Sequence, residues 1–117
     1  MKLSNAQKKL YDRLTSTLAV FDKYATHEEF FDNSKGEQNT LTTAWHCNSL
    51  YDSSEKFQQR EPEVWEKMRQ NFYKAKNERI IIARAKTETM NALVRAGLIE
   101  IIEPAKYNGG PETVRVI

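Results

Sequence analysis

Residues 87–103 read TETMNALVRAGLIEIIE, and this stretch decides the expected fold. Thr87 is a good N-cap, because its hydroxyl can accept a hydrogen bond from a backbone N–H of the first helical turn. An apolar stripe at helical spacing follows, formed by Met90, Leu93, Val94 and Gly97. Gly97 also stands where a helix needs a left-handed stop. Residues 98–102 then read as an Ile-rich β-strand, so the stretch predicts a helix that turns directly into a strand.

A turn and further strands surround this unit. Pro104 ends the strand, since proline cannot donate to a ladder. Residues 107–111, YNGGP, are typical of a turn, and residues 113–117, TVRVI, alternate as a second strand. Residues 79–83 hold three consecutive isoleucines and read as a strand that could pair with this hairpin. Residues 83–86 could instead continue a helix.

Two helices with capping boxes are expected near the N-terminus. Ser4 and Gln7 have the S-x-x-Q spacing that opens a helix, which we place over residues 5–23. Thr26 and Glu29 repeat the pattern as T-x-x-E and predict a short second helix.

A long helix is expected over residues 62–77, because Pro62 is well placed at a first helical position. Residues 39–59 are interpreted as a helix, with a strand as the alternative, and Ser53 or Ser54 could start a turn within them. The fold class is therefore mainly α with a small antiparallel β-sheet, in one domain spanning residues 1–117.

Composition narrows the class of protein only slightly. The chain of 117 residues has a net charge of +2, which permits a nucleic-acid partner without requiring one. Cys47 is the single cysteine, so no intramolecular disulfide can form. There is neither a long apolar run nor an apolar segment after the N-terminal lysines. We expect no membrane partner and a cytoplasmic location.

The stretch TxxALVRAGLIEII followed by a hairpin resembles the last helix and the wing of winged helix-turn-helix domains. The N-terminal LSNAQKKLYDRL resembles the first helix of small phage and prophage proteins that end the same way. The resemblance implies a winged-helix-like fold and a phage-encoded protein acting in the host cytoplasm. The chain departs from the pattern in one respect, because only one helix fits between Ile82 and Leu98, where winged helices usually have two.

The charge is distributed unevenly along the chain. Residues 1–25 carry a net charge of +3, residues 26–63 of −5, residues 64–86 of +5 and residues 87–117 of −1. The basic run within 64–86 could contact phosphates, with Tyr73 as a stacking group, or it could be a solvated helix face. Folding could also gather this run beside Lys8, Lys9 and Arg13 into one patch.

The first functional hypothesis is a DNA-binding regulator. DNA would be contacted by Arg84, Lys86, Asn91, Arg95 and Lys106. Asn91 is an amide that could read adenine, and Arg95 is the other plausible base reader of the helix.

The second hypothesis is a phage-type interaction protein that inhibits a host protein, in the manner of anti-defence or anti-CRISPR factors. The acidic segment 26–63 supports it, since an acidic surface can imitate nucleic acid. A homodimer is compatible with both hypotheses.

No residue constellation indicates catalysis. His46 and Cys47 are sequence neighbours, whose side chains usually point apart, and His27 stands alone. A structural zinc site needs about four ligands at suitable spacing. We therefore expect no enzyme activity, no metal and no cofactor.

Overall fold

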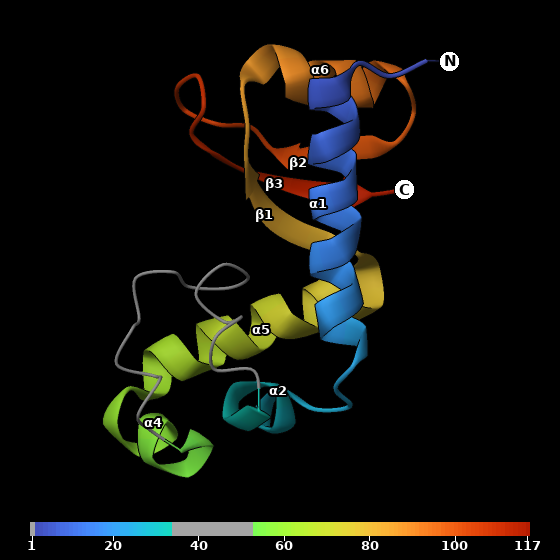
Figure 1. Cartoon of the computed structure of the whole chain (residues 1–117). Helices are drawn as coiled ribbons and strands as arrows, with labels where there is room; N and C mark the ends of the chain where they lie inside the picture. The colour runs from blue at the N-terminus through green and yellow to red at the C-terminus, as the bar shows by residue number, and fades with distance from the viewer. Residues whose placement is uncertain (1, 34–52) are drawn as a thin grey trace.

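The computed structural model describes residues 2–33 and 53–117. These residues form five helices and a three-stranded antiparallel sheet near the C-terminus, which confirms the mainly α fold class with a small sheet (Figure 1). The helices are α1 (Asn5–Asp22), α2 (His27–Asn33), α4 (Ser54–Arg60), α5 (Pro62–Glu78) and α6 (Thr87–Arg95), and the strands are β1 (Ile80–Arg84), β2 (Ile99–Glu103) and β3 (Pro111–Val116). Residues 39–52 of the helix expected over 39–59 lie outside the described residues.

The predicted capping box begins α1, whereas at α2 the Thr26 cap forms but the Glu29 side chain bonds one residue earlier than in a capping box. The Ser4 hydroxyl accepts from the Gln7 N–H at 3.2 Å, and the Gln7 side chain accepts from the Ser4 N–H at 3.0 Å. The Thr26 hydroxyl accepts from the Glu29 N–H at 3.2 Å, while the Glu29 carboxylate accepts from the Ala25 N–H. Both helices therefore begin where side chains satisfy backbone donors that have no partner within the helix.

The end of α5 turns the chain sharply without a glycine. Pro62 is the first residue of the helix, as expected, and Arg79 follows its last turn in the left-handed conformation, with φ of 59°. That conformation is costly for a residue with a Cβ, and hydrogen bonds from β3 hold it. The Arg79 Nε donates to the Val116 carbonyl at 2.9 Å, and the Val116 N–H donates to the Arg79 carbonyl at 3.0 Å.

The sheet has the order β1-β3-β2, so β3 lies in the middle. Ala83 and Arg84 pair with β3, which makes the alternative of a continued helix over residues 83–86 wrong. Because side chains alternate along β1, Ile81 joins the main core while Ile82 is 46% exposed on the other face. In β2 a bulge shifts the register beside Ile102, which is 43% exposed.

The start of α6 differs from the sequence prediction. Thr87 is the first helical residue rather than the N-cap, and Lys86 in the cap position makes no side-chain cap bond. The acceptor comes instead from the β2–β3 loop, because the Asn108 side-chain oxygen accepts from the Thr87 N–H at 3.0 Å and from its hydroxyl at 3.1 Å.

The C-terminal end of α6 follows the prediction more closely. Gly97 has the expected positive φ of 75°. Met90 and Leu93 of the predicted apolar stripe are fully buried, but Val94 is 38% exposed. Val94 lies about 100° around the helix from Leu93, so its side chain points away from the core.

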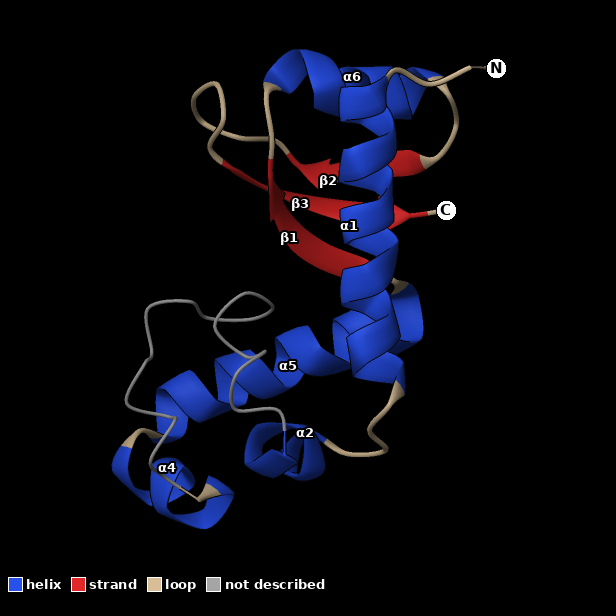
Figure 2. Cartoon of the chain, viewed as in Figure 1, coloured by secondary structure: helices blue, strands red, loops and turns tan. Residues whose placement is uncertain are grey.

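The buried side chains form two clusters. The larger joins α1, α6 and the sheet, and it also includes Phe30 of α2 and Phe72 of α5. The smaller joins α2, α4 and α5 around Phe31 and Trp65. Figure 2 shows α1 in front of the sheet, with α2, α4 and α5 grouped toward the C-terminal end of α1.

Candidate nucleic-acid interface

All five residues predicted to contact DNA are exposed. Arg84 ends β1, Lys86 precedes α6, Asn91 and Arg95 lie within α6, and Lys106 lies in the β2–β3 loop. Figure 1 shows α6 and this loop at the same end of the molecule. The fold therefore brings residues from three elements to one region.

The outward face of α6 carries the two predicted contacts of the helix. Asn91 and Arg95 are four residues apart, so they lie on the same face, one turn after the other. Glu88 is exposed in the first turn, where the helix dipole favours its negative charge. The face thus offers one amide and one cation beside one carboxylate.

The β2–β3 loop is attached to the N-terminal end of α6. The paired hydrogen bonds from Thr87 to Asn108 fix the loop against the helix. Within the loop, the Gly110 N–H donates to the Tyr107 carbonyl at 3.0 Å, and Gly109 supplies a positive φ of 82°. Lys86 and Lys106 each lie within two residues of the Thr87–Asn108 pair, so these two cations flank the attachment.

Arg13 joins this region from α1. Its guanidinium donates to the backbone carbonyl of Arg84. The two residues are 71 positions apart in the sequence, so no local pattern could have predicted this hydrogen bond. The sequence indicated only that folding could bring Arg13 beside the basic run 64–86. Asn108 was also missed as a structural contact, because its turn signal indicates a loop without showing what the side chain binds.

The rest of the basic run does not converge on α6. Lys67 and Lys74 belong to α5 and line a hollow of about 430 Å³ next to the outward face of the sheet. Arg69 pairs with Glu66 at 3.3 Å. These cations therefore lie on α5, before the turn at Arg79, whereas Arg84 and Lys86 lie after it.

Tyr73, the possible stacking group, is half-buried and makes several contacts within the protein. Its ring packs edge-on against Phe72, with the centroids 4.9 Å apart, and the Arg69 guanidinium lies over it at 5.4 Å. Its hydroxyl accepts a hydrogen bond from the His27 N–H at 3.4 Å. These contacts give Tyr73 a packing role.

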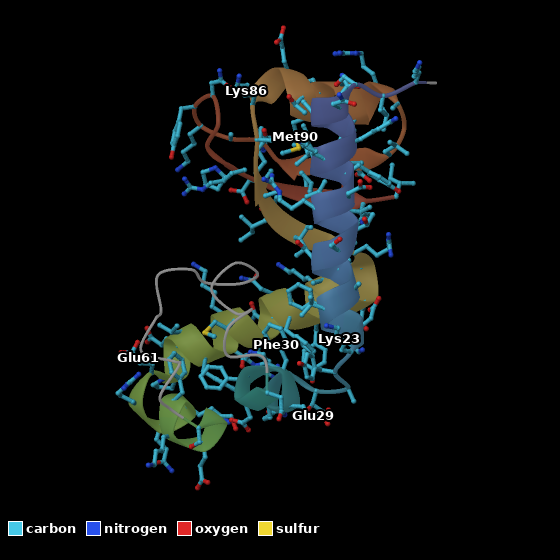
Figure 3. All side chains as sticks on the ribbon, in the orientation of Figure 1. Lys23, Glu29, Phe30, Glu61, Lys86 and Met90 are labelled. Carbon is cyan, nitrogen blue, oxygen red and sulfur yellow. The ribbon has the colours of Figure 1, made fainter. Side chains whose placement is uncertain are left out.

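The described acids of the segment 26–63 belong to α2, α4 and the start of α5, at the opposite end of the molecule from α6. Figure 3 places Glu29 and Glu61 far from Lys86. Several of these acids have structural roles: Asp32 accepts hydrogen bonds from the Ser54 N–H at 2.9 Å and from the Ser54 hydroxyl at 3.0 Å. These acids are therefore distant from Lys86, although the cations of α5 lie on a helix that packs against α2 and α4.

His27 is buried among aromatic rings rather than exposed at a site. Its side chain has no exposed surface, and its ring centroid is 4.3 Å from that of Trp65. Burial and the positive charge of Arg69 lower the pKa of His27 to about 4, so the ring is neutral at pH 7. Within residues 2–33 and 53–117, no three His, Cys, Asp or Glu side chains are placed to hold a metal ion.

The remaining observations concern membrane spans and similarity to known proteins. Among the described helices, none is both long and apolar enough to cross a membrane. Searches against protein-family models, curated proteins and solved structures found no match to this chain.

Proposed function

We propose that the chain is a small, non-enzymatic DNA-binding protein, a regulator of the phage type, that binds DNA with α6 and the β2–β3 loop. The observation that carries the proposal is the attachment of this loop to the first residue of α6 through Asn108. It presents an exposed helix and an exposed basic loop as one surface, as a recognition helix and a wing are presented in winged-helix domains.

The strand arrangement supports the same reading. The order β1-β3-β2, with α6 before β2 and the loop between β2 and β3, is the order of a winged-helix sheet. The chain differs by having one helix between β1 and β2, and by carrying α2, α4 and α5 between α1 and β1. The winged-helix comparison is therefore made for the C-terminal half, from β1 onward.

The charges set the expected strength of binding. Arg84, Lys86, Arg95 and Lys106 would contact phosphates, and Asn91 would reach a base edge. Each neutralised phosphate contributes roughly −0.9 to the slope of log affinity against log salt. With four such contacts, raising salt from about 50 to about 200 mM should weaken binding about 100-fold.

The test is a fluorescence-anisotropy titration of mixed duplexes at those two salt concentrations. Arg95→Glu should weaken binding about 10-fold or more and reduce the salt slope by about one, while leaving the melting temperature unchanged. Lys56→Glu is the matched control, because it reverses the same charge at an exposed position in α4. Equal affinity of the Arg95→Glu and Lys56→Glu variants would count against the interface.

A second candidate function is binding to a host protein as an inhibitor. It is favoured by the outward sheet face, where Ile82 and Ile102 are about half exposed, and by the acidic residues of α2 and of the start of α5. A pull-down from host lysate with the wild type and Ile82→Glu tests it. Capture of one host protein by the wild type alone, without DNA binding at low salt, would favour this function over the first.

A further inference from the structure

The tip of the β2–β3 loop carries an exposed aromatic ring. Tyr107 is 62% exposed, and it is the single exposed aromatic side chain within residues 2–33 and 53–117. We propose that Tyr107 is a stacking platform for an unpaired base, so that DNA containing an unpaired base is a better ligand than an intact duplex. This inference rests on the proposed DNA-binding function and specifies its ligand.

The ring is held in position by the backbone beneath it. A Cβ placed on Gly110 would lie 3.1 Å from Cζ and 3.2 Å from Cε1 of Tyr107, closer than ordinary van der Waals contact. The ring therefore lies directly against the Gly110 backbone, which has no side chain to displace it. Gly110 is buried, and its N–H also bonds to the Tyr107 carbonyl at 3.0 Å.

The loop that carries the ring is itself fixed. Asn108 is bonded to Thr87, so the loop is attached to α6 one residue away from Tyr107. An aromatic ring that is already ordered loses little conformational entropy when a ligand stacks on it. This preorganisation distinguishes Tyr107 from a scattered apolar residue at the surface, which would need no functional explanation.

The neighbouring charges fit a nucleic-acid ligand. Lys106 adjoins Tyr107 in sequence, and Lys86 lies on the other side of the Asn108–Thr87 attachment; both are exposed. Proteins that bind single-stranded nucleic acid combine such cations for the backbone with aromatic rings for the bases. The charges attract the phosphates on either side, and the ring receives the base between them.

The preference for an unpaired base follows from access. In an intact duplex each base is stacked between its neighbours, so its flat face cannot reach Tyr107 until it has been unstacked and unpaired. Much less free energy is needed to move a base out of the helix when it has no pairing partner. Stacking of one base on an aromatic side chain corresponds to a gain in affinity of roughly 5- to 100-fold.

The experiment compares two duplexes of the same sequence, one of which contains a single extra, unpaired adenine. Affinities are measured by anisotropy at one salt concentration. The wild type should bind the bulged duplex roughly 5- to 100-fold more tightly. Tyr107→Leu should lower the ratio of the two affinities to about one while keeping the affinity for the intact duplex. Tyr107→Phe should keep the wild-type ratio. Gly110→Ala should reduce it, because the new methyl group would lie 3.1 Å from both the ring and the carbonyl oxygen of Tyr107, so that the ring or the turn must shift.

The outcomes separate this inference from the broader proposal. A bulge also bends DNA, but a preference for bent DNA would survive Tyr107→Leu. Equal wild-type affinity for the two duplexes, or a ratio unchanged by Tyr107→Leu, overturns the inference and leaves the DNA-binding function standing. Absence of binding to either duplex at low salt overturns both. Because Tyr107 is exposed, we expect each Tyr107 variant to keep the circular-dichroism spectrum and melting temperature of the wild type.

Discussion

Lowering the pH from about 7.5 to about 5 should weaken the fold by about 2 kcal/mol through His27 alone. The ring of His27 is fully buried, with Phe72 at 5.5 Å and Trp65 at 4.3 Å between centroids. Neither ring nitrogen has a hydrogen-bond partner among the described residues. A proton added to this ring would place an unpaired charge in an apolar cluster, near the positive Arg69.

The magnitude follows from the pKa. Burial, followed by the charge of Arg69, lowers the pKa of His27 from 6.5 to about 4 in the folded state. Between these values the unfolded chain binds a proton that the folded chain does not, so stability is complete above pH 6.5 and falls as the pH falls. The loss grows from about 2 kcal/mol near pH 5 to about 3 kcal/mol below pH 4.

The assay is urea denaturation at both pH values for the wild type, His27→Phe and His27→Leu. Other groups titrate in all three proteins, so their contribution cancels when the pH-induced changes in the free energy of unfolding are compared. The wild type should lose about 2 kcal/mol more than either variant. Equal losses would refute the reasoning, and two substitutions of different shape guard against a poor fit of one side chain.

Three other substitutions test the packing, the helix stop and the loop attachment. Phe72→Ala should lower the free energy of unfolding by about 4 kcal/mol in urea denaturation, because the ring is fully buried against Phe30 at 5.2 Å; a loss below about 1 kcal/mol would contradict this packing. Gly97→Ala should cost about 1 kcal/mol through its positive φ alone, since no atom lies within 4 Å of the added Cβ, and Gly97→Asn should cost less. Asn108→Ala should lower thermal stability by about 1 kcal/mol and also weaken DNA binding, although it removes no charge; Asn108→Asp, which keeps an acceptor for Thr87, should restore most of the stability.

Local signals predicted most of the described secondary structure. The capping box at Ser4, the hydroxyl cap at Thr26, the proline at position 62 and the glycine at position 97 each act within a few residues, so the sequence alone located these helix ends. The three strands were also predicted, because an Ile-rich run and an alternating run separated by YNGGP leave few other pairings.

Contacts between residues far apart in the sequence could not be predicted from such local signals. The cap of α6 comes from Asn108, 21 residues beyond Thr87, and therefore leaves no local pattern. The turn at Arg79 lacks the glycine that usually marks a left-handed residue, so the sequence did not indicate that α5 diverges from β1. For the candidate site, exposure of all five predicted residues followed from their polarity, whereas the approach of Arg13 to Arg84 depended on the tertiary fold.

The position of β3 has a consequence for synthesis. It is the last strand in the chain, yet it lies between β1 and β2, which share no hydrogen bonds with each other. At translation rates of about 5 to 20 residues per second, β1 must wait roughly 2 to 6 seconds on the ribosome for its partner. During that time its three isoleucines have no strand to pair with. A product that stops before residue 111 would keep two unpaired apolar strands, so we expect it to be degraded or to aggregate in cells.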